Sequence, residues 1–176
     1  MQMDEVSERI NQLYRAYLLT SFEEEYYRER HSTSLETSNH FDLIVGLGAA
    51  LSGGSGLGIL ANPAFAWVCG TLTSASVLAA VVKQSYRLDE KARASLERVA
   101  LYGGARIEYL SLVQDVQAKK QWNEEFETRF SEMRSRFAKY SPFPYSHWDE
   151  ERLRAIQNKI KNREDYEKWW KFTRSI

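Results

Sequence analysis

The pattern of charged and uncharged positions is dominated by a stretch of 40 residues between Asp42 and Lys83 that carries no charged side chain. Charged residues make up 27% of the whole chain, so this gap sets one segment apart from the rest. A helix needs about 20 apolar residues to cross the hydrocarbon core of a bilayer. The sequence Ala-Asn-Pro-Ala at 61–64 is a turn signal, because Pro cannot continue a helix. The pattern therefore predicts a transmembrane hairpin with crossings at 43–60 and 65–82, and with both long ends of the chain on the same side.

A buried helical hairpin in a soluble domain is the alternative interpretation of this stretch. The first segment is rich in Gly and Ser, and the mean hydropathy of the whole chain, −0.53, is that of a soluble protein. A core helix of a soluble protein, however, normally shows charged side chains on its outer face, and neither segment has one. We therefore favour the membrane hairpin.

Small residues follow a regular spacing in the first segment. Gly46 begins a stripe of Gly and Ala at every fourth position, and Gly48, Ser52 and Gly56 form a second stripe beside it. In lipid, small residues let helix backbones approach closely and so favour association. The stripes are expected to pack the two segments together, to associate several hairpins around a narrow path, or to do both. The candidate packing or pore-lining residues are Gly46, Ala50, Gly54, Gly58 and Gly70.

The sequence contains no pattern typical of an enzyme or of a cofactor site. The Gly-rich stretch lacks the third Gly of a dinucleotide fingerprint and the Lys-Ser/Thr of a P-loop. The chain as a whole shows no Ser/His/Asp or Cys/His combination of catalytic residues and no paired carboxylates that suit catalysis. The three His residues do not cluster with Cys or carboxylates at metal-ligand spacing, and the single Cys69 cannot form an internal disulfide. We expect no enzymatic activity, no cofactor and no metal.

Charge is distributed unevenly in the polar parts of the chain. Residues 1–42 hold nine acidic and four basic side chains, a net charge of −5, whereas residues 134–176 hold six acidic and eleven basic ones, a net charge of +5. The acidic run Glu23–Glu25 is expected to form a solvated face, to pair with the basic tail, or to form a ring of carboxylates near a pore mouth. Every Lys and Arg lies outside the two predicted crossings and the turn between them, so the positive-inside rule predicts that both termini are cytoplasmic.

Helical periodicity continues on both sides of the hairpin. Apolar residues recur at steps of three and four from Ile10 to Phe22. An aromatic stripe with similar steps runs from Trp122 to Tyr140, which suits packing on a neighbouring helix or protomer. The expected fold is an all-α membrane protein, in which a transmembrane hairpin adjoins a cytoplasmic bundle of the N- and C-terminal helices. Its expected parts are an N-terminal helix (1–41), the hairpin (42–83), a long helical region (84–140) and a basic aromatic C-terminal helix (141–176).

The C-terminal helix combines basic side chains with Trp, Tyr and Phe, after a capping box at 146–149. Three interpretations remain open. The helix docks on the first helix through opposite charge and aromatic packing, it lies on the inner leaflet, or it binds an anionic nucleotide or oligonucleotide through phosphate contacts and base stacking. The candidate ligand-binding residues are Arg129, Arg136, Lys159, Lys161 and Arg163.

The layout resembles the SLATT family of two-transmembrane effectors of bacterial anti-phage systems. The resemblance is carried by LIVGLGAALSGGSGLGIL, ANPA and FAWVCGTLTSASVLAAVV, followed by the helical run from Lys83. It implies a pore-forming effector of the bacterial inner membrane that works with a nucleotide-synthesising enzyme and causes growth arrest or death on infection. The cytoplasmic helices would then sense a nucleotide signal, which either opens the pore or holds it shut.

A pore needs several hairpins around one path, and we expect a homo-oligomer, with a tetramer as the smallest suitable assembly. The alternative function is a membrane-anchored helical adaptor or scaffold without a pore. In that case the hairpin is an anchor and the aromatic stripe is a docking surface.

Overall fold

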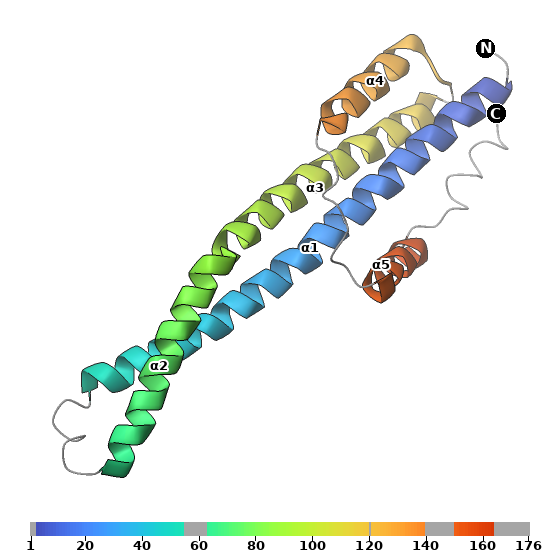
Figure 1. The fold of residues 1–176 in the computed structure, drawn as a ribbon. Helices are drawn as coiled ribbons and strands as arrows, with labels where there is room; N and C mark the ends of the chain where they lie inside the picture. Colours follow the sequence, from blue (N-terminus) through green and yellow to red (C-terminus); the bar gives the residue numbers. More distant parts are fainter. Residues whose placement is uncertain (1–2, 55–62, 120, 140–149, 164–176) are drawn as a thin grey trace. The chain divides into compact units, whose positions relative to one another are not determined.

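The computed structural model of the chain describes residues 3–54, 63–119, 121–139 and 150–163. These residues form five α-helices and contain no strand, which confirms the all-α prediction (Figure 1). The helices are α1 (Met3–Gly54), α2 (Pro63–Tyr86), α3 (Leu88–Lys119), α4 (Glu124–Ala138) and α5 (Glu150–Arg163).

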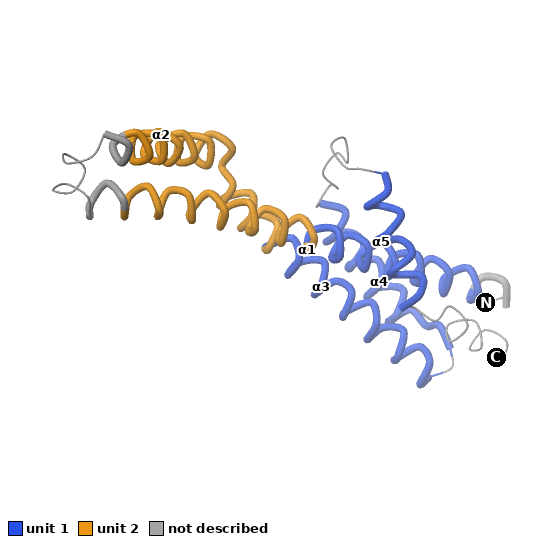
Figure 2. The backbone as a smooth tube through the Cα atoms, turned by 90° about the horizontal axis from the view of Figure 1, so that it is seen from below, with its two compact units in different colours: residues 1–27, 97–176 blue, residues 28–96 orange. Residues whose placement is uncertain are grey.

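The chain divides into two compact units that interleave along the sequence (Figure 2). Unit 1 combines Met1–Tyr27 with Glu97–Ile176, and unit 2 comprises Arg28–Leu96. The expected bundle of N- and C-terminal helices corresponds to unit 1, and unit 2 contains the uncharged hairpin.

α1 is longer than the expected N-terminal helix. It continues without a break past residue 41 to Gly54, so the N-terminal helix and the described part of the first hairpin segment are one helix. The polar stretch after His31 does not end α1, because side chains of this stretch form hydrogen bonds within the helix. The Thr37 hydroxyl, for example, donates to the Thr33 carbonyl at 2.8 Å. A Ser or Thr that bonds one turn back stays compatible with helical backbone.

The region expected to be one helical run at 84–140 contains two breaks. At the first, Arg87 alone leaves the helical conformation, with a φ of 50°. At the second, Asn123 caps α4, and its side-chain oxygen accepts a hydrogen bond from the Phe126 N–H at 2.9 Å. An Asn cap satisfies an amide that would otherwise lack an acceptor. Each break removes so few residues that the apolar periodicity does not reveal it.

α4 packs its aromatic side chains into the main core of unit 1. Phe126, Phe130 and Met133 are buried, and Trp122, which precedes the helix, is buried beside them. The Phe130 ring lies edge-on to Trp122, with centroids 6.1 Å apart, and 6.2 Å from Tyr109 of α3. Burying one side chain of this size stabilises a fold by about 1.5–3 kcal/mol. The aromatic stripe is therefore a packing surface within the chain.

Unit 2 is a helical hairpin in which the second half of α1 packs on α2 and on the start of α3. The His31 ring nitrogen Nδ1 lies 2.9 Å from the carbonyl of Ala92, which joins α1 to α3. α2 begins at Pro63 and ends at Tyr86, instead of spanning 65–82. Pro suits a first helical position, because the N–H it lacks would have no helical acceptor there. The first half of the expected turn, at 61–62, lies outside the described residues.

Candidate functional site

Asp42 and Lys83, which bound the uncharged stretch in the sequence, meet at the base of the hairpin. The Lys83 ammonium lies 2.7 and 2.8 Å from the carboxylate oxygens of Asp42 and 3.3 Å from an oxygen of Asp89. The Ser38 hydroxyl donates to Asp89 at 2.7 Å. These contacts fix the register of the two arms. The two ends of the uncharged stretch therefore lie side by side.

Hydrogen bonds shift the ionisation of this cluster in the direction expected for ion pairing. The pKa of Lys83 is raised, chiefly by its hydrogen bond to Asp42. The pKa of Asp89 is lowered, chiefly by the hydrogen bond from Ser38 and further by Lys83. Both groups are solvent-accessible, and ion pairs of this kind contribute little stability. The main role of the cluster is therefore to set register.

Beyond this base, large hydrophobic side chains are exposed on both arms. Trp67 of α2 is 78% exposed and Leu43 of α1 is 62% exposed, whereas the small side chains Cys69, Ser76 and Ala79 are buried on α2. A soluble hairpin has the opposite distribution, with large apolar side chains in its interface and charged ones outside. The exposed large hydrophobic residues of the hairpin are Leu43, Ile44, Leu47, Trp67, Val68, Val77, Leu78 and Val81.

Gly48, which begins the second small-residue stripe, lets the two arms approach each other closely. A Cβ atom on Gly48 would lie 2.3 Å from the Cβ of Ser76 and 3.3 Å from the Leu72 carbonyl oxygen. No side chain fits in that space, so α1 and α2 approach each other here only because position 48 is Gly. Part of the expected packing role therefore belongs to Gly48.

The first stripe is not used for packing where the structure describes it. A Cβ atom on Gly46 or Gly70 would meet nothing within 4 Å, and Ala50 is exposed. Gly54 is the last described residue of α1, and Gly58 lies outside the described residues. Gly46, Ala50 and Gly70 therefore lie on open surface in the single chain.

The candidate ligand-binding arginines of α4 form ion pairs with α3. Arg129 lies 2.7 Å from Asp115, and Arg136 lies 2.9 Å from Glu108. All four side chains are partly exposed, and pairs of this kind contribute about 0–1 kcal/mol each. An anionic ligand at either arginine has to compete with a carboxylate.

The candidate cations of α5 lie next to a buried carboxylate. Lys159 bonds to Glu25 of α1, and Arg163 lies 3.8 Å from the same carboxylate, whose side chain is only 4% exposed. Ile156 and Ile160 are buried in a cluster that includes tyrosines of α1 and α3. α5 therefore docks on α1 through opposite charge and through isoleucines that pack on tyrosines, which agrees with the charge part of the first interpretation of the C-terminal helix. The aromatic side chains of that helix, at 166–172, lie outside the described residues.

The five candidate cations do not gather at one place. Arg129 and Arg136 pair with acids of α3, Lys159 and Arg163 with an acid of α1, and Lys161 is exposed on α5.

Sequence reasoning missed the burial of the acidic run. Glu23, Glu24 and Glu25 are all buried, not solvated. Glu24 lies 2.7 Å from Arg106, and this hydrogen bond is the chief reason that the pKa of Arg106 is raised. The Glu24 carboxylate lies 3.5 Å from the place where a side chain on Gly103 would begin. An added Cβ atom there would make only an ordinary van der Waals contact, so Gly103 does not signal the buried acid in the sequence.

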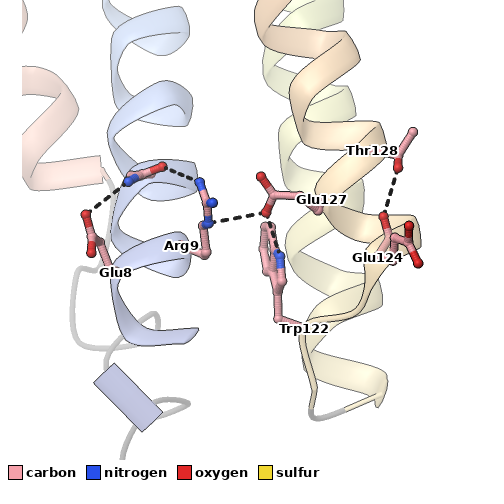
Figure 3. Close-up of polar contacts among 7 residues, drawn as sticks. Glu8, Arg9, Trp122, Glu124, Glu127 and Thr128 are labelled. Carbon is pink, nitrogen blue, oxygen red and sulfur yellow. Dashed lines mark hydrogen bonds and ion pairs between the residues drawn. The ribbon is translucent and has the colours of Figure 1, made fainter. Parts of the chain in front are cut away.

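A polar network near the start of α1 joins this helix to α4 (Figure 3). Arg9 lies 3.3 Å from Glu127, and the same carboxylate accepts a hydrogen bond from the Trp122 indole N–H at 3.0 Å. Gln12 extends the network to Glu8. These contacts anchor the indole of a core tryptophan, so the network has a structural role.

Within residues 3–54, 63–119, 121–139 and 150–163, no helix has both the length and the apolarity needed to cross a membrane. No group of three or more His, Cys, Asp or Glu side chains in that part of the chain is arranged to hold a metal ion.

Comparison of the chain with family models, curated proteins and solved structures finds no match. The function is therefore argued from the hairpin and from the α5 contact.

Proposed function

We propose that this chain is an oligomeric pore-forming effector of the bacterial inner membrane, gated by a cytoplasmic nucleotide or oligonucleotide signal and causing growth arrest or death. The observation that carries the proposal is the hairpin of unit 2. An ion pair between Asp42 and Lys83 lies at its base, and the sequence between these two residues contains no charged side chain. Large apolar side chains are exposed on both arms. Such a surface is more stable in lipid than in water.

The limited apolarity of the arms is consistent with insertion as an assembly. α2 carries Gly, Ser and Thr among its apolar residues, and the first segment extends to residue 60, beyond the described residues. A helix that packs on other copies or lines a watery path does not need apolar side chains on every face. We therefore propose that several hairpins insert together.

The open small residues Gly46 and Ala50 of α1 and Gly70 of α2 are the proposed contacts between copies. They are exposed in the single chain and have room for a neighbouring backbone. Close packing of small residues is a usual source of helix association in lipid. A tetramer remains the proposed assembly.

The proposed signal acts on α5. A phosphate group competes with Glu25 for Lys159 and Arg163, because it offers several strong acceptor oxygens in a charge-assisted contact. Displacement would leave Glu25 as a buried charge without these two cations, which is costly, so α5 is expected to move away. A linked nucleotide-synthesising enzyme supplies the ligand.

Leakage from liposomes tests the pore. The purified full-length chain is reconstituted into phosphatidylethanolamine–phosphatidylglycerol vesicles that contain a fluorescent dye, with and without ATP or short oligoadenylates. We expect leakage that rises steeply with protein density, and we expect Gly46→Leu to reduce it at least about tenfold, because a bulky side chain blocks the close approach of copies.

Gly104→Leu is the matched control. Gly104 is also an exposed helical glycine at which an added Cβ atom would meet nothing within 4 Å, but it lies in unit 1. It is expected to leave leakage unchanged. Vesicles that stay tight at every protein density, with and without ligand, contradict the pore.

A membrane-anchored adaptor is the second candidate, and the ion pairs of the candidate cations favour it. Arg129, Arg136, Lys159 and Arg163 all pair with acids within the chain, which an adaptor without a ligand explains directly. This candidate predicts that the chain floats with vesicles in a density gradient and that the vesicles do not leak.

A further inference from the structure

A single residue separates α2 from α3. α2 ends at Tyr86, α3 begins at Leu88, and Arg87 between them has a φ of 50°. The left-handed helical region is unfavourable for any residue with a Cβ atom and is populated mainly by Gly, Asn and Asp. Arginine is therefore an unusual residue for this conformation.

The residue types around Arg87 do not predict a break in the helix. The segment from Lys83 to Arg93 contains no Gly, Pro or Asn, and Gln, Arg, Leu, Glu, Lys and Ala are good helix formers. Left to local preference, α2 and α3 would continue as one helix. Tertiary contacts must therefore hold the break.

The charges around Arg87 have the signs that stabilise two separate helix ends. Lys83 lies in the last turn of α2, and Asp89 and Glu90 lie in the first turn of α3. Cations favour helix C-termini and anions favour N-termini. Within a continuous helix this contribution would be lost, because no helix end would remain.

Contacts within unit 2 reinforce the break. Lys83 pairs with Asp42 on α1 and with Asp89 across the break. Arg87 pairs with Glu90, and its N–H donates to the Gln84 carbonyl at 3.1 Å, one residue short of the α-helical pattern. Helix propensity therefore favours a continuous helix at this residue, whereas the helix-end charges and the contacts of Lys83 favour the break.

We propose that Arg87 is a hinge at which α2 and α3 interconvert between two helices and one continuous helix, with the contacts of Lys83 to Asp42 and Asp89 holding the broken state. Converting one residue from left-handed to right-handed conformation reorients α2 on the start of α3. α2 carries much of the exposed apolar surface of the hairpin, so the hinge sets the direction of that surface. The inference does not depend on the chain being a pore.

Amide hydrogen exchange at Leu88–Glu90 distinguishes the two states. These amides lie in the first turn of α3 and have no helical acceptor in the broken state, whereas in a continuous helix they bond to carbonyls of residues 84–86. Arg87→Gly relieves the left-handed conformation and favours the break, whereas Arg87→Ala favours the continuous helix. We expect protection of these amides in the purified full-length chain to be about tenfold higher for Arg87→Ala than for Arg87→Gly.

Ala94→Gly is the matched control, because it makes the same exchange of residue types at an exposed position of α3 away from the hinge. It is expected to leave Leu88–Glu90 unchanged. Equal protection at Leu88–Glu90 in Arg87→Ala and Arg87→Gly overturns the inference.

A second variant tests what holds the break. Lys83→Met removes both ion pairs but keeps most of the side-chain volume, and it is expected to raise protection at Leu88–Glu90. Exchange of the α2 amides in the same experiment reports whether the hairpin remains folded. Unchanged or lower protection at Leu88–Glu90, with α2 still protected, shows that Lys83 does not hold the hinge.

Discussion

At the scale of single residues, two glycines that are two positions apart have opposite surroundings. Gly48→Ala places a Cβ atom against Ser76 and is expected to destabilise unit 2 by about 1–3 kcal/mol, the usual cost of overpacking. Gly46→Ala adds a Cβ in open space and is expected to stabilise by about 0.8–1 kcal/mol through helix propensity. Thermal unfolding of the detergent-solubilised chain measures both changes. Shifts of the same sign and size contradict the different roles of the two stripes.

The hairpin base is expected to respond to acid. The pKa of Asp89 is lowered from 3.8 in the folded chain, chiefly by the Ser38 hydrogen bond. A carboxyl group with a lowered folded pKa stabilises the fold above its unfolded pKa, and this contribution is lost as the pH falls below 3.8 and through the folded pKa. We expect Ser38→Ala to raise the titration midpoint of Asp89 toward 3.8, measured by the NMR shift of its carboxyl carbon.

Thr37→Ala is the control for this titration, because the Thr37 hydroxyl donates within α1 to the Thr33 carbonyl. It is expected to leave the Asp89 midpoint unchanged. A midpoint that stays the same in Ser38→Ala assigns the lowered pKa of Asp89 to Lys83 instead.

At the scale of elements, the docking of α5 depends on few contacts. Ile156 is fully buried, and Ile156→Ala is expected to weaken docking by about 2–5 kcal/mol through lost contact and cavity formation. Gln157→Ala changes the exposed neighbouring position and is the matched control. Hydrogen exchange of residues 150–163 measures docking. We expect much faster exchange only in Ile156→Ala, and equal exchange in both variants would show that Ile156 does not hold α5.

Element types were predicted better than element ends. Periodicity identified the helical segments because apolar side chains recur on one face whatever the tertiary context. The ends depend on single residues, such as the cap Asn123 and the left-handed Arg87. Asn123 is a usual capping residue, a signal that apolar periodicity does not carry. The break at Arg87 accompanies the contact of Lys83 with Asp42 of α1, which the local sequence does not reveal.

At the scale of the whole molecule, the uneven charge of the sequence has a tertiary counterpart in unit 1. The acidic N-terminal part meets the basic C-terminal part through Glu25, Lys159 and Arg163. The sequence allowed this pairing as one interpretation among several. Only the fold selects it, because the contact joins residues that are far apart along the chain and so depends on how α1 and α5 are brought together.

The sequence by itself determined the all-α class, the uncharged stretch between Asp42 and Lys83 and the small-residue stripes, because these follow from composition and local spacing. The tertiary structure decided that Asp42 and Lys83 pair with each other, that Gly48 and not Gly46 faces α2, and that the run Glu23–Glu25 is buried. These properties depend on which helix faces meet, and a helical sequence specifies its own faces but not the helices that cover them.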